Sequence, residues 1–410
     1  MRSSLLGIAV TAQQNSHLAI AIRSCLTIVL LGSLSAHAAE PILDRQRARD
    51  LGIVIGRHQT GPLNAITDVG GVRIGHRTLI QGEGPLKPGV GPVRTGVTII
   101  SPRDDVWHQK VSAGAFVLNG TGEMTGLAWV AESGFLEYPI ALTNTLNVPR
   151  VANGVITWMI TQYPEIGISD DTLTPIVGEC DDGRLNDIQG RHVSEQDVIS
   201  AIEGASGGPV AEGSVGAGTG MVAYGFKGGI GTSSRRLLDK EGGYIVGVLV
   251  NANHGRRHEL MIQGAPVGRL YEPSQTHTQI PSPGQSEGSI IVVIATDAPL
   301  DGRQLTRLAK RAALGLARTG STARHGSGDF MLAFSTANII PHYPKEPTYS
   351  LTHLADTHLN PLIEATVEAT EEAILNALTM ATTVVGRDGY RAEAIDLGRV
   401  KAVLSGSLRN

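Results

Sequence analysis

Short runs of aliphatic and β-branched residues alternate with segments of helical spacing along most of the chain. The apolar runs predict strands at 96–101, 113–118, 244–250, 289–296 and 329–335, and two short strands around Gly70-Gly71 within 63–76. Helical spacing predicts helices at 151–163, 194–202, 305–318 and 361–381. Because strands and helices alternate without a strict strand–helix–strand rhythm, the pattern predicts stacked layers of helix and sheet.

One polar stretch interrupts this pattern. Residues 271–288 contain three prolines and almost no apolar residue, and a continuous apolar run begins directly after them at Ser289. Such a composition predicts an exposed loop that leads into a buried strand. The sequence shows no internal repeat and no second boundary as clear as this one.

The first 38 residues have the parts of a secretory signal. Arg2 and Arg23 precede an apolar run at 26–34, and Ala36-His37-Ala38 follows it. The run is too short to cross a bilayer as a helix. We therefore expect residues 1–38 to be removed and the protein to be periplasmic or secreted. A disordered extension, or an upstream start codon that is not used, is the alternative.

Composition narrows the class of protein. The chain has 410 residues with 41% hydrophobic residues, 51 glycines and a net charge of −4. These values exclude a collagen and disfavour a disordered chain. The near-neutral charge offers no electrostatic case for nucleic acid or an acidic membrane as a partner. Since aromatic residues make up only 4% of the chain, the core must consist mainly of Val, Ile, Leu and Ala.

Several short motifs do not support a known chemistry. Gly204-Ala-Ser206-Gly-Gly208 matches the nucleophile elbow, but a helical pattern precedes it and Pro209 follows, which favours the C-terminal turn of a helix. His254 and His258 lack the H-E-x-x-H order, and no phosphate-binding loop is present. We therefore predict neither a metal nor a cofactor. Cys180, the one thiol outside the signal, is a buried filler or, less commonly, a nucleophile.

The junction between Gly288 and Ser289 carries candidate chemistry. A serine at the mouth of a core strand, after a glycine that tolerates unusual backbone angles, can attack the carbonyl that precedes it. Cleavage would leave Ser289 with a free α-amine, whose ordinary pKa of about 7.7–8 suits a general base. A plain turn before a strand is the alternative that these residues leave open.

Longer motifs resemble the L-aminopeptidase/D-esterase family, which includes bacterial β-peptidyl aminopeptidases. The resemblance spans residues 40–400 and is carried by Asn64-Ala-Ile-Thr-Asp-Val69, Asn119-Gly-Thr-Gly-Glu-Met-Thr-Gly126, Leu142-Thr-Asn-Thr145, Gly218-Thr-Gly-Met221, Tyr224-Gly-Phe-Lys-Gly-Gly229, Asn253-His-Gly255, Gly288-Ser-Ile-Ile-Val-Val293, Ala295-Thr-Asp-Ala-Pro-Leu300, Gly326-Ser-Gly-Asp329 and Ala333-Phe-Ser-Thr-Ala-Asn338.

The resemblance implies an α+β protein with an αββα sandwich, similar to N-terminal-nucleophile hydrolases but differently connected. It also implies cleavage between Gly288 and Ser289 into pieces 39–288 and 289–410, which together form one domain. The activity implied is hydrolysis of amides and esters at the free amino end of short peptides, with tolerance for D- or β-residues. Homo-oligomers of processed pairs are implied as well.

Four residues match the family's reaction machinery. Ser289 matches the nucleophile, and Ser327 with Asp329 matches a pair that hydrogen-bonds the nucleophile and its amine. Two residues apart on a strand, Ser327 and Asp329 should share one face. Asn253 matches an oxyanion donor, although the residues alone favour a turn role for it.

Two acidic residues match the family's substrate site. Glu179 matches the carboxylate that receives the substrate's amine. Without the resemblance, a single glutamate is expected to be a solvated side chain. Asp181 stands where relatives have an aromatic residue, and its charge would strengthen cation binding but oppose an oxyanion. The alternatives are an acyltransferase of ornithine acetyltransferase-like architecture and an uncleaved, non-catalytic periplasmic binding protein.

Overall fold

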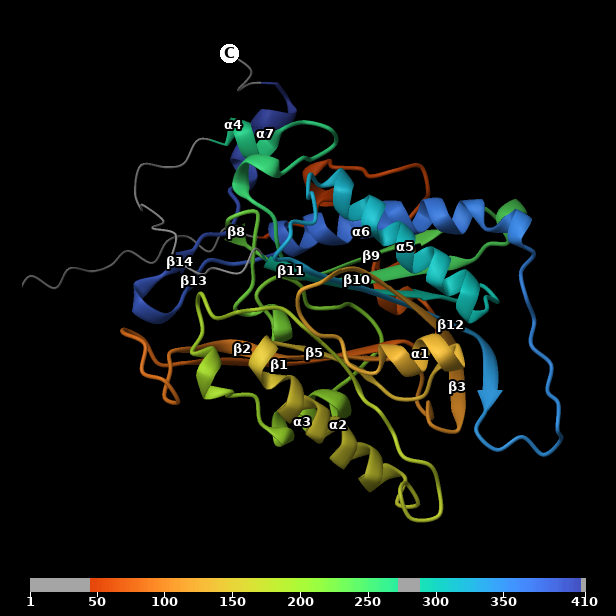
Figure 1. The fold of residues 1–410 in the computed structure, drawn as a ribbon. Coiled ribbons are helices and arrows are strands. Elements are labelled where there is room, and N and C mark those ends of the chain that lie inside the picture. Colours follow the sequence, from red (N-terminus) through yellow and green to blue (C-terminus); the bar gives the residue numbers. More distant parts are fainter. Residues whose placement is uncertain (1–44, 272–287, 407–410) are drawn as a thin grey trace, which may run out of the picture. The chain divides into compact units, whose positions relative to one another are not determined.

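Two stacked β-sheets form the centre of the computed structural model, which describes residues 45–271 and 288–406 (Figure 1). The smaller sheet has the strand order β1-β2-β5-β6, and the larger has the order β4-β3-β12-β11-β10-β9. Helices α2 and α3 pack on the smaller sheet, and α5 and α6 pack on the larger one. This part of the chain therefore has the four-layer αββα arrangement that the sequence predicts.

The strands and helices have the following bounds. The strands of the two sheets are β1 (Arg73–Gln81), β2 (Val93–Ser101), β3 (Gln109–Gly120), β4 (Phe135–Leu136), β5 (Ile140–Thr143), β6 (Ile176–Glu179), β9 (Gly229–Arg236), β10 (Ile245–His254), β11 (Gly288–Thr296) and β12 (Gly328–Pro341). Two short hairpins are β7 (Val222–Ala223) with β8 (Phe226–Lys227), and β13 (Val384–Val385) with β14 (Arg391–Ala392). The helices are α1 (Leu127–Ser133), α2 (Val148–Gln162), α3 (Glu195–Glu203), α4 (Val267–Leu270), α5 (Gly302–Arg318), α6 (Asn360–Thr379) and α7 (Leu397–Leu404).

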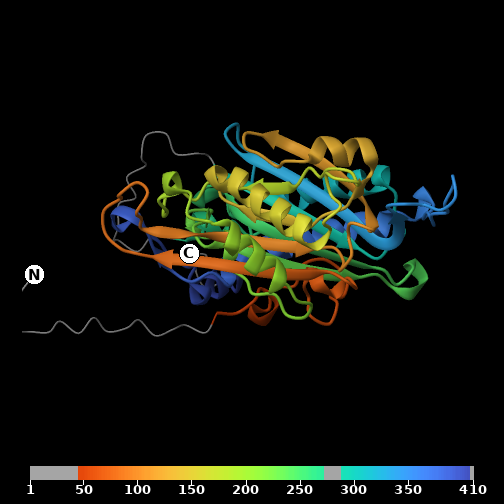
Figure 2. The same ribbon diagram turned by 90° about the horizontal axis from the view of Figure 1, so that it is seen from below.

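Each sheet contains one parallel pair of strands, and the connection within each pair forms one helix of the outer layer on that sheet. β5 and β6 are parallel, as are β11 and β12. Parallel neighbours need a crossover connection, and α2 and α5 supply it in the two sheets. Figure 2 views the side on which α2 and α3 lie over the smaller sheet.

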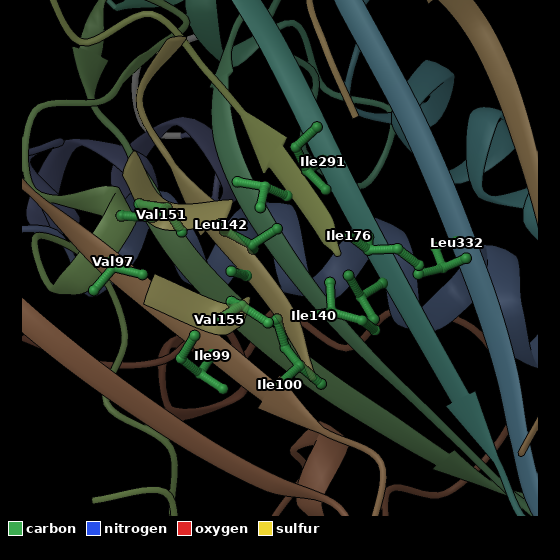
Figure 3. Packing of buried hydrophobic residues seen from close by; sticks show 14 of the residues in the cluster. Val97, Ile99, Ile100, Ile140, Leu142, Val151, Val155, Ile176, Ile291 and Leu332 are labelled. Atoms are coloured by element: carbon green, nitrogen blue, oxygen red, sulfur yellow. The ribbon is translucent and has the colours of Figure 1, made fainter. Parts of the chain in front are cut away.

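Side chains that alternate along the central strands divide the interior into two cores. On β11, Ile291 and Val293 belong to the core between the sheets, whereas Ile290 and Val292 belong to the core under α5 and α6. Figure 3 shows Ile291 and Leu332 of the larger sheet near aliphatic residues of β5 and β6. A strand buried on both faces reads as a continuous apolar run, which is why the sequence predicted β11 correctly.

The structure confirms most of the predicted elements and corrects one. The first of the two strands expected around Gly70-Gly71 is wrong, because Ile66–Asp68 forms a 3-10 turn. The Asp68 carboxylate accepts hydrogen bonds from the backbone N–H groups of Leu63 and Ala65, at 2.9 and 3.1 Å. Those donors are thus satisfied locally rather than by a neighbouring strand.

The predicted signal and most of the predicted linker lie outside the described residues. Among the helices that are described, none has the length and apolar character that a membrane crossing requires.

Candidate active site

Ser289 lies at the start of β11, between Asn253 and the segment that carries Ser327 and Asp329. In the sheet register it lies opposite Asn253 of β10 and beside Gly328 of β12. Its side chain is buried with the residue 5% exposed, and its Oγ accepts a hydrogen bond from the Gly328 N–H at 3.3 Å. Three neighbouring strands therefore bring the candidate nucleophile, the oxyanion candidate and the segment from 327 to 329 together.

Gly288 occupies a backbone conformation that requires glycine. Its φ is +96°, in the left-handed region. A Cβ built on it would lie 2.3 Å from the carbonyl oxygen of Asn253, which is far closer than real contacts allow. Only glycine can therefore precede Ser289 and still enter the sheet at this register.

Ser327 and Asp329 form the hydrogen-bonded pair that their spacing predicts. The Ser327 hydroxyl donates to Asp329 Oδ1 at 2.7 Å, and the Asn119 amide donates to Asp329 Oδ2 at 3.1 Å. Burial raises the pKa of Asp329, while these two hydrogen bonds act in the opposite direction. In the continuous chain Ser289 Oγ accepts from Gly328, so a role of the pair toward the nucleophile stays a prediction.

Asn119 is a site residue that the sequence reasoning did not single out. The structure places it within β3 and opposite Asp329 in the register. Its amide also donates to the backbone carbonyls of Ala323 and Arg324, at 2.7 and 3.0 Å. Its place within a family motif was the only available signal.

The side chain of Asn253 is held at both ends by backbone groups. The Val222 N–H donates to its Oδ1 at 2.8 Å, and its Nδ2 donates to the Asp181 carbonyl at 2.9 Å. These two contacts define which end of the amide is oxygen and leave the second N–H of Nδ2 for another acceptor. The alternative of a turn residue is wrong, because β10 continues through His254.

Glu179 ends β6 and is buried rather than solvated, with only 2% of the residue exposed. Its Oε1 accepts from the Glu123 N–H at 2.9 Å, and its Oε2 accepts from the Thr145 hydroxyl. Burial raises its pKa, and the two hydrogen bonds act in the opposite direction. The partners described for this carboxylate are neutral donors, so no cation among them offsets the charge of its ionised form.

Asp181 has a backbone role as well as a carboxylate. Its Oδ1 accepts from the Gly183 N–H at 2.8 Å, and its carbonyl is the one that accepts from Asn253. Asp181 thus connects the strand end that carries Glu179 to the oxyanion candidate. Contact of its carboxylate with substrate stays a prediction.

Two alternative nucleophiles are disfavoured by their surroundings. Gly204 caps the end of α3 and Ser206 pairs with Ile74 as an isolated bridge, so this motif is not a nucleophile elbow. Cys180 is fully buried, and burial raises the pKa of its thiol well above the ordinary value. A protonated, inaccessible thiol is a poor nucleophile.

One cluster among the described residues has the composition of a metal site. Asp170, Asp171 and His342 each place a ligand atom within 4.8 Å of the others. The Asp170 carboxylate already accepts from Trp107 Nε1 at 3.0 Å and contacts His342 Nε2 at 2.8 Å. The cluster joins a loop to the C-terminal end of β12, whereas Asp329 lies at the other end of that strand.

The sequence matches a known peptidase family. The sequence model described as Peptidase family S58 matches residues 64–392. The beta-peptidyl aminopeptidase BapA of Sphingosinicella xenopeptidilytica is 45% identical over 378 residues, which cover 90% of this chain and 93% of that protein.

Solved structures share the fold. The PH0078 protein of Pyrococcus horikoshii OT3 is 47% identical with a TM-score of 0.83, covering 88% of this chain and 99% of that one. The L-aminopeptidase D-Ala-esterase/amidase of Ochrobactrum anthropi is 41% identical with a TM-score of 0.79, covering 88% and 98%. That structure is described as a prototype for the serine aminopeptidases and a new variant among the Ntn hydrolase fold, which confirms the predicted fold class.

Proposed function

The chain belongs to peptidase family S58 and is a serine-type aminopeptidase, and from this premise we propose that it matures by cleaving itself between Gly288 and Ser289. The observation that carries the proposal is the position of Ser289. It opens a strand, follows a glycine that the backbone requires, and lies opposite Asn253 in the register. The products would be the pieces 39–288 and 289–410.

Self-cleavage proceeds in two steps. Ser289 Oγ attacks the Gly288 carbonyl carbon, the C–N bond breaks, and the departing Ser289 amine takes up the hydroxyl proton. The resulting ester is hydrolysed by water, which returns a proton to Oγ and leaves a carboxylate on Gly288. Ser289 then has a hydroxyl beside its own α-amine, a base with an ordinary pKa near 7.7–8.

The same serine then hydrolyses substrate. Its amine accepts the hydroxyl proton while Oγ attacks the substrate carbonyl, and the proton passes to the departing amine. Asn253 donates its second N–H to the oxyanion, and Ser327 with Asp329 orients the Ser289 amine. One such oxyanion donor contributes about 10²–10³ in kcat. Water releases the acyl group and restores the serine.

Glu179 selects substrates with a free amino end. The ammonium group of the substrate would provide the opposite charge for the buried Glu179 carboxylate, whose two described donors are neutral. Charge-assisted hydrogen bonds of this kind are stronger than neutral ones, so internal peptides would bind less well. We propose short peptides, amides and esters as substrates, D- or β-residues among them. The β-residues are supported by the name of the relative from Sphingosinicella.

A gel and N-terminal sequencing test the proposal. Purified protein should run as two pieces, and the smaller should begin Ser-Ile-Ile-Val. Ser289→Ala should stay one chain and lose aminopeptidase activity by about 10⁴-fold or more, since the nucleophile and its base disappear together. A single full-length chain with wild-type activity would refute the self-cleavage proposal.

Export and assembly are further parts of the proposal. The signal-like pattern of residues 1–38 supports a periplasmic or secreted protein, whose larger piece should begin near residue 39. Cell fractionation tests this. The resemblance to the family supports a homo-oligomer of processed pairs, which light scattering of the purified protein tests.

A further inference from the structure

Lys227 is a buried lysine whose ammonium is surrounded by backbone carbonyls. It has no exposed surface, and its Nζ donates to the carbonyls of Gly218, Met221 and Gly228 at 2.8, 2.8 and 2.9 Å. An ammonium has three N–H groups, whereas a neutral amine has two and a lone pair that would face the third carbonyl. The three contacts therefore match the charged form.

These carbonyls belong to the turn that holds Asn253. Met221 directly precedes Val222, whose N–H donates to Asn253 Oδ1 at 2.8 Å. A backbone hydrogen bond also holds this turn, because the Gly228 N–H donates to the Met221 carbonyl at 3.0 Å. Lys227 thus fixes the segment that presents one of the two backbone groups on the Asn253 amide.

Asp182 lies next to the other backbone group. Its neighbour Asp181 provides the carbonyl that accepts from Asn253 Nδ2. Asp182 is fully buried, with its carboxylate bonded to the amides of Asn144 and Asn186 at 3.1 and 2.9 Å. Gly220 allows the two segments to touch, since a Cβ there would lie 2.7 Å from the Asp182 Cβ.

Charge supports this arrangement. Burial lowers the pKa of Lys227 to about 7, and the carboxylate of Asp182 acts in the opposite direction. Burial also raises the pKa of Asp182 to about 7. A buried ammonium is costly unless it is hydrogen-bonded, and the three carbonyls meet that condition here.

We propose that Lys227 is a positioning residue for the oxyanion donor. Its ammonium ties the 218–228 turn into the shape that keeps the Val222 N–H on Asn253 Oδ1, and this directs the free N–H of Asn253 toward the reacting carbonyl. The inference rests on the oxyanion role of Asn253 in the proposed function, and it adds the group that sets the orientation of that amide.

A double-mutant cycle tests the inference. Lys227→Met, Asn253→Ala and the double variant are compared with the wild type for kcat and KM on a chromogenic aminoacyl anilide. Asn253→Ala should lower kcat by about 10²–10³-fold. Lys227→Met should lower it by about 10–100-fold with KM changed less than about 3-fold, and in the Asn253→Ala background its effect should fall below about 3-fold.

The outcomes separate the inference from the proposed function. If Asn253→Ala leaves kcat unchanged, the oxyanion role fails and the inference fails with it. If Asn253→Ala lowers kcat but Lys227→Met has the same effect in both backgrounds, only the positioning role fails. Where a variant does not mature, the rate of self-cleavage replaces kcat in the same cycle.

Two further variants guard against a general loss of structure. Lys110→Met removes another buried lysine, paired with Glu137 at 2.5 Å, and should lower the melting temperature without a change in kcat. If Lys227→Met does not fold, Lys227→Gln takes its place in the cycle, because its neutral amide has only two N–H groups for the three carbonyls. A kcat loss that depends on Asn253 supports the inference, and one that does not overturns it.

Discussion

Two groups of buried carboxylates in this protein have opposite surroundings. Glu368 and Glu372 of α6 contact the guanidinium of Arg235 on β9 at 3.2 and 2.8 Å, and all three side chains are almost completely buried. At the candidate active site, Glu179 and Asp329 are equally buried but accept hydrogen bonds from neutral donors. Burial alone therefore does not distinguish a structural carboxylate from a functional one.

The difference lies in the cation. A buried carboxylate with a resident guanidinium is neutralised within the protein and acts as a structural tie. A buried carboxylate without one has its pKa raised and remains able to bind a cation or transfer a proton, as the pKa values of Glu179 and Asp329 indicate. This contrast separates Glu179 and Asp329 from the two carboxylates of α6, and it also includes Asp182 and Asp297, whose pKa values burial raises.

The ion pairs between α6 and the two arginines also join the two pieces that the proposed cleavage would produce. Arg49 and Arg235 come from the proposed larger piece, and Glu368 and Glu372 come from the smaller one. Together with the pairing of β10 and β11, these ion pairs would keep the two pieces associated after the peptide bond is cut. Four variants test the comparison, in order of expected effect.

Arg235→Met should have the largest effect, and it should act on stability. It leaves Glu368 buried without a cation and Glu372 with only Arg49, which costs about 3–5 kcal/mol in the free energy of unfolding. Chemical denaturation measures the loss, and kcat of the folded fraction should stay within about 2-fold of wild type. As a control, Arg303→Ala removes a surface pair with Asp356 and should cost at most about 1 kcal/mol. Equal losses in the two variants would contradict the comparison.

Glu179→Ala should act on substrate binding. Loss of the only proposed anchor for the amine should raise KM for free-amine substrates by about 10²-fold, with self-cleavage changed far less. Steady-state kinetics on a free and an N-acetylated substrate measure this, since the acetylated one has no ammonium to lose. An equal loss of self-cleavage and substrate hydrolysis would rule out the anchor role.

The pH dependence of Glu179 has a defined sign. Because its folded-state pKa lies above the ordinary 4.5, substrate binding should weaken as the pH falls through that raised value. Stability should follow the opposite course. The native state holds a proton that the unfolded state releases, so the free energy of unfolding decreases as the pH rises from 4.5 through the raised pKa. Glu179→Gln should remove both dependences in pH series of KM and of denaturation, and a variant with the wild-type profiles would refute this.

Asn119→Ala should have the smallest effect. It removes a hydrogen bond that favours the ionised form of Asp329, so kcat should fall by about 10-fold and the acidic limb of the pH–rate profile should move to higher pH. Thr121→Val is the matched control. Its hydroxyl donates to the carbonyl of His325 at 3.1 Å, in the same segment whose carbonyls Asn119 contacts, and it does not reach Asp329. A lowered kcat with an unmoved profile would indicate only a structural role for Asn119.

Apolar periodicity predicted the long apolar strands and helices well, but it missed the four-residue strands β5 and β6 and the polar strand β9. β11 and α5 follow directly from their patterns, and the capping box at Ser194 marks the start of α3. β9 was missed because its sequence is rich in Gly, Ser and Arg. Two of its polar side chains are buried against α6: Ser233 donates to the Ala369 carbonyl at 2.7 Å, and Arg235 pairs with Glu368 and Glu372. No local pattern reveals partners that lie over a hundred residues away.

The sequence alone determined the αββα layering, through a family resemblance, and the candidate nucleophile at an abrupt change from polar loop to apolar strand. Only the tertiary structure decided what surrounds each candidate. It made Glu179 a buried carboxylate with neutral partners, moved Asn253 from a turn into a strand, and brought Asn119 to Asp329. The physical reason is that burial, charge pairing and amide orientation depend on neighbours from other strands, and sequence spacing does not specify them.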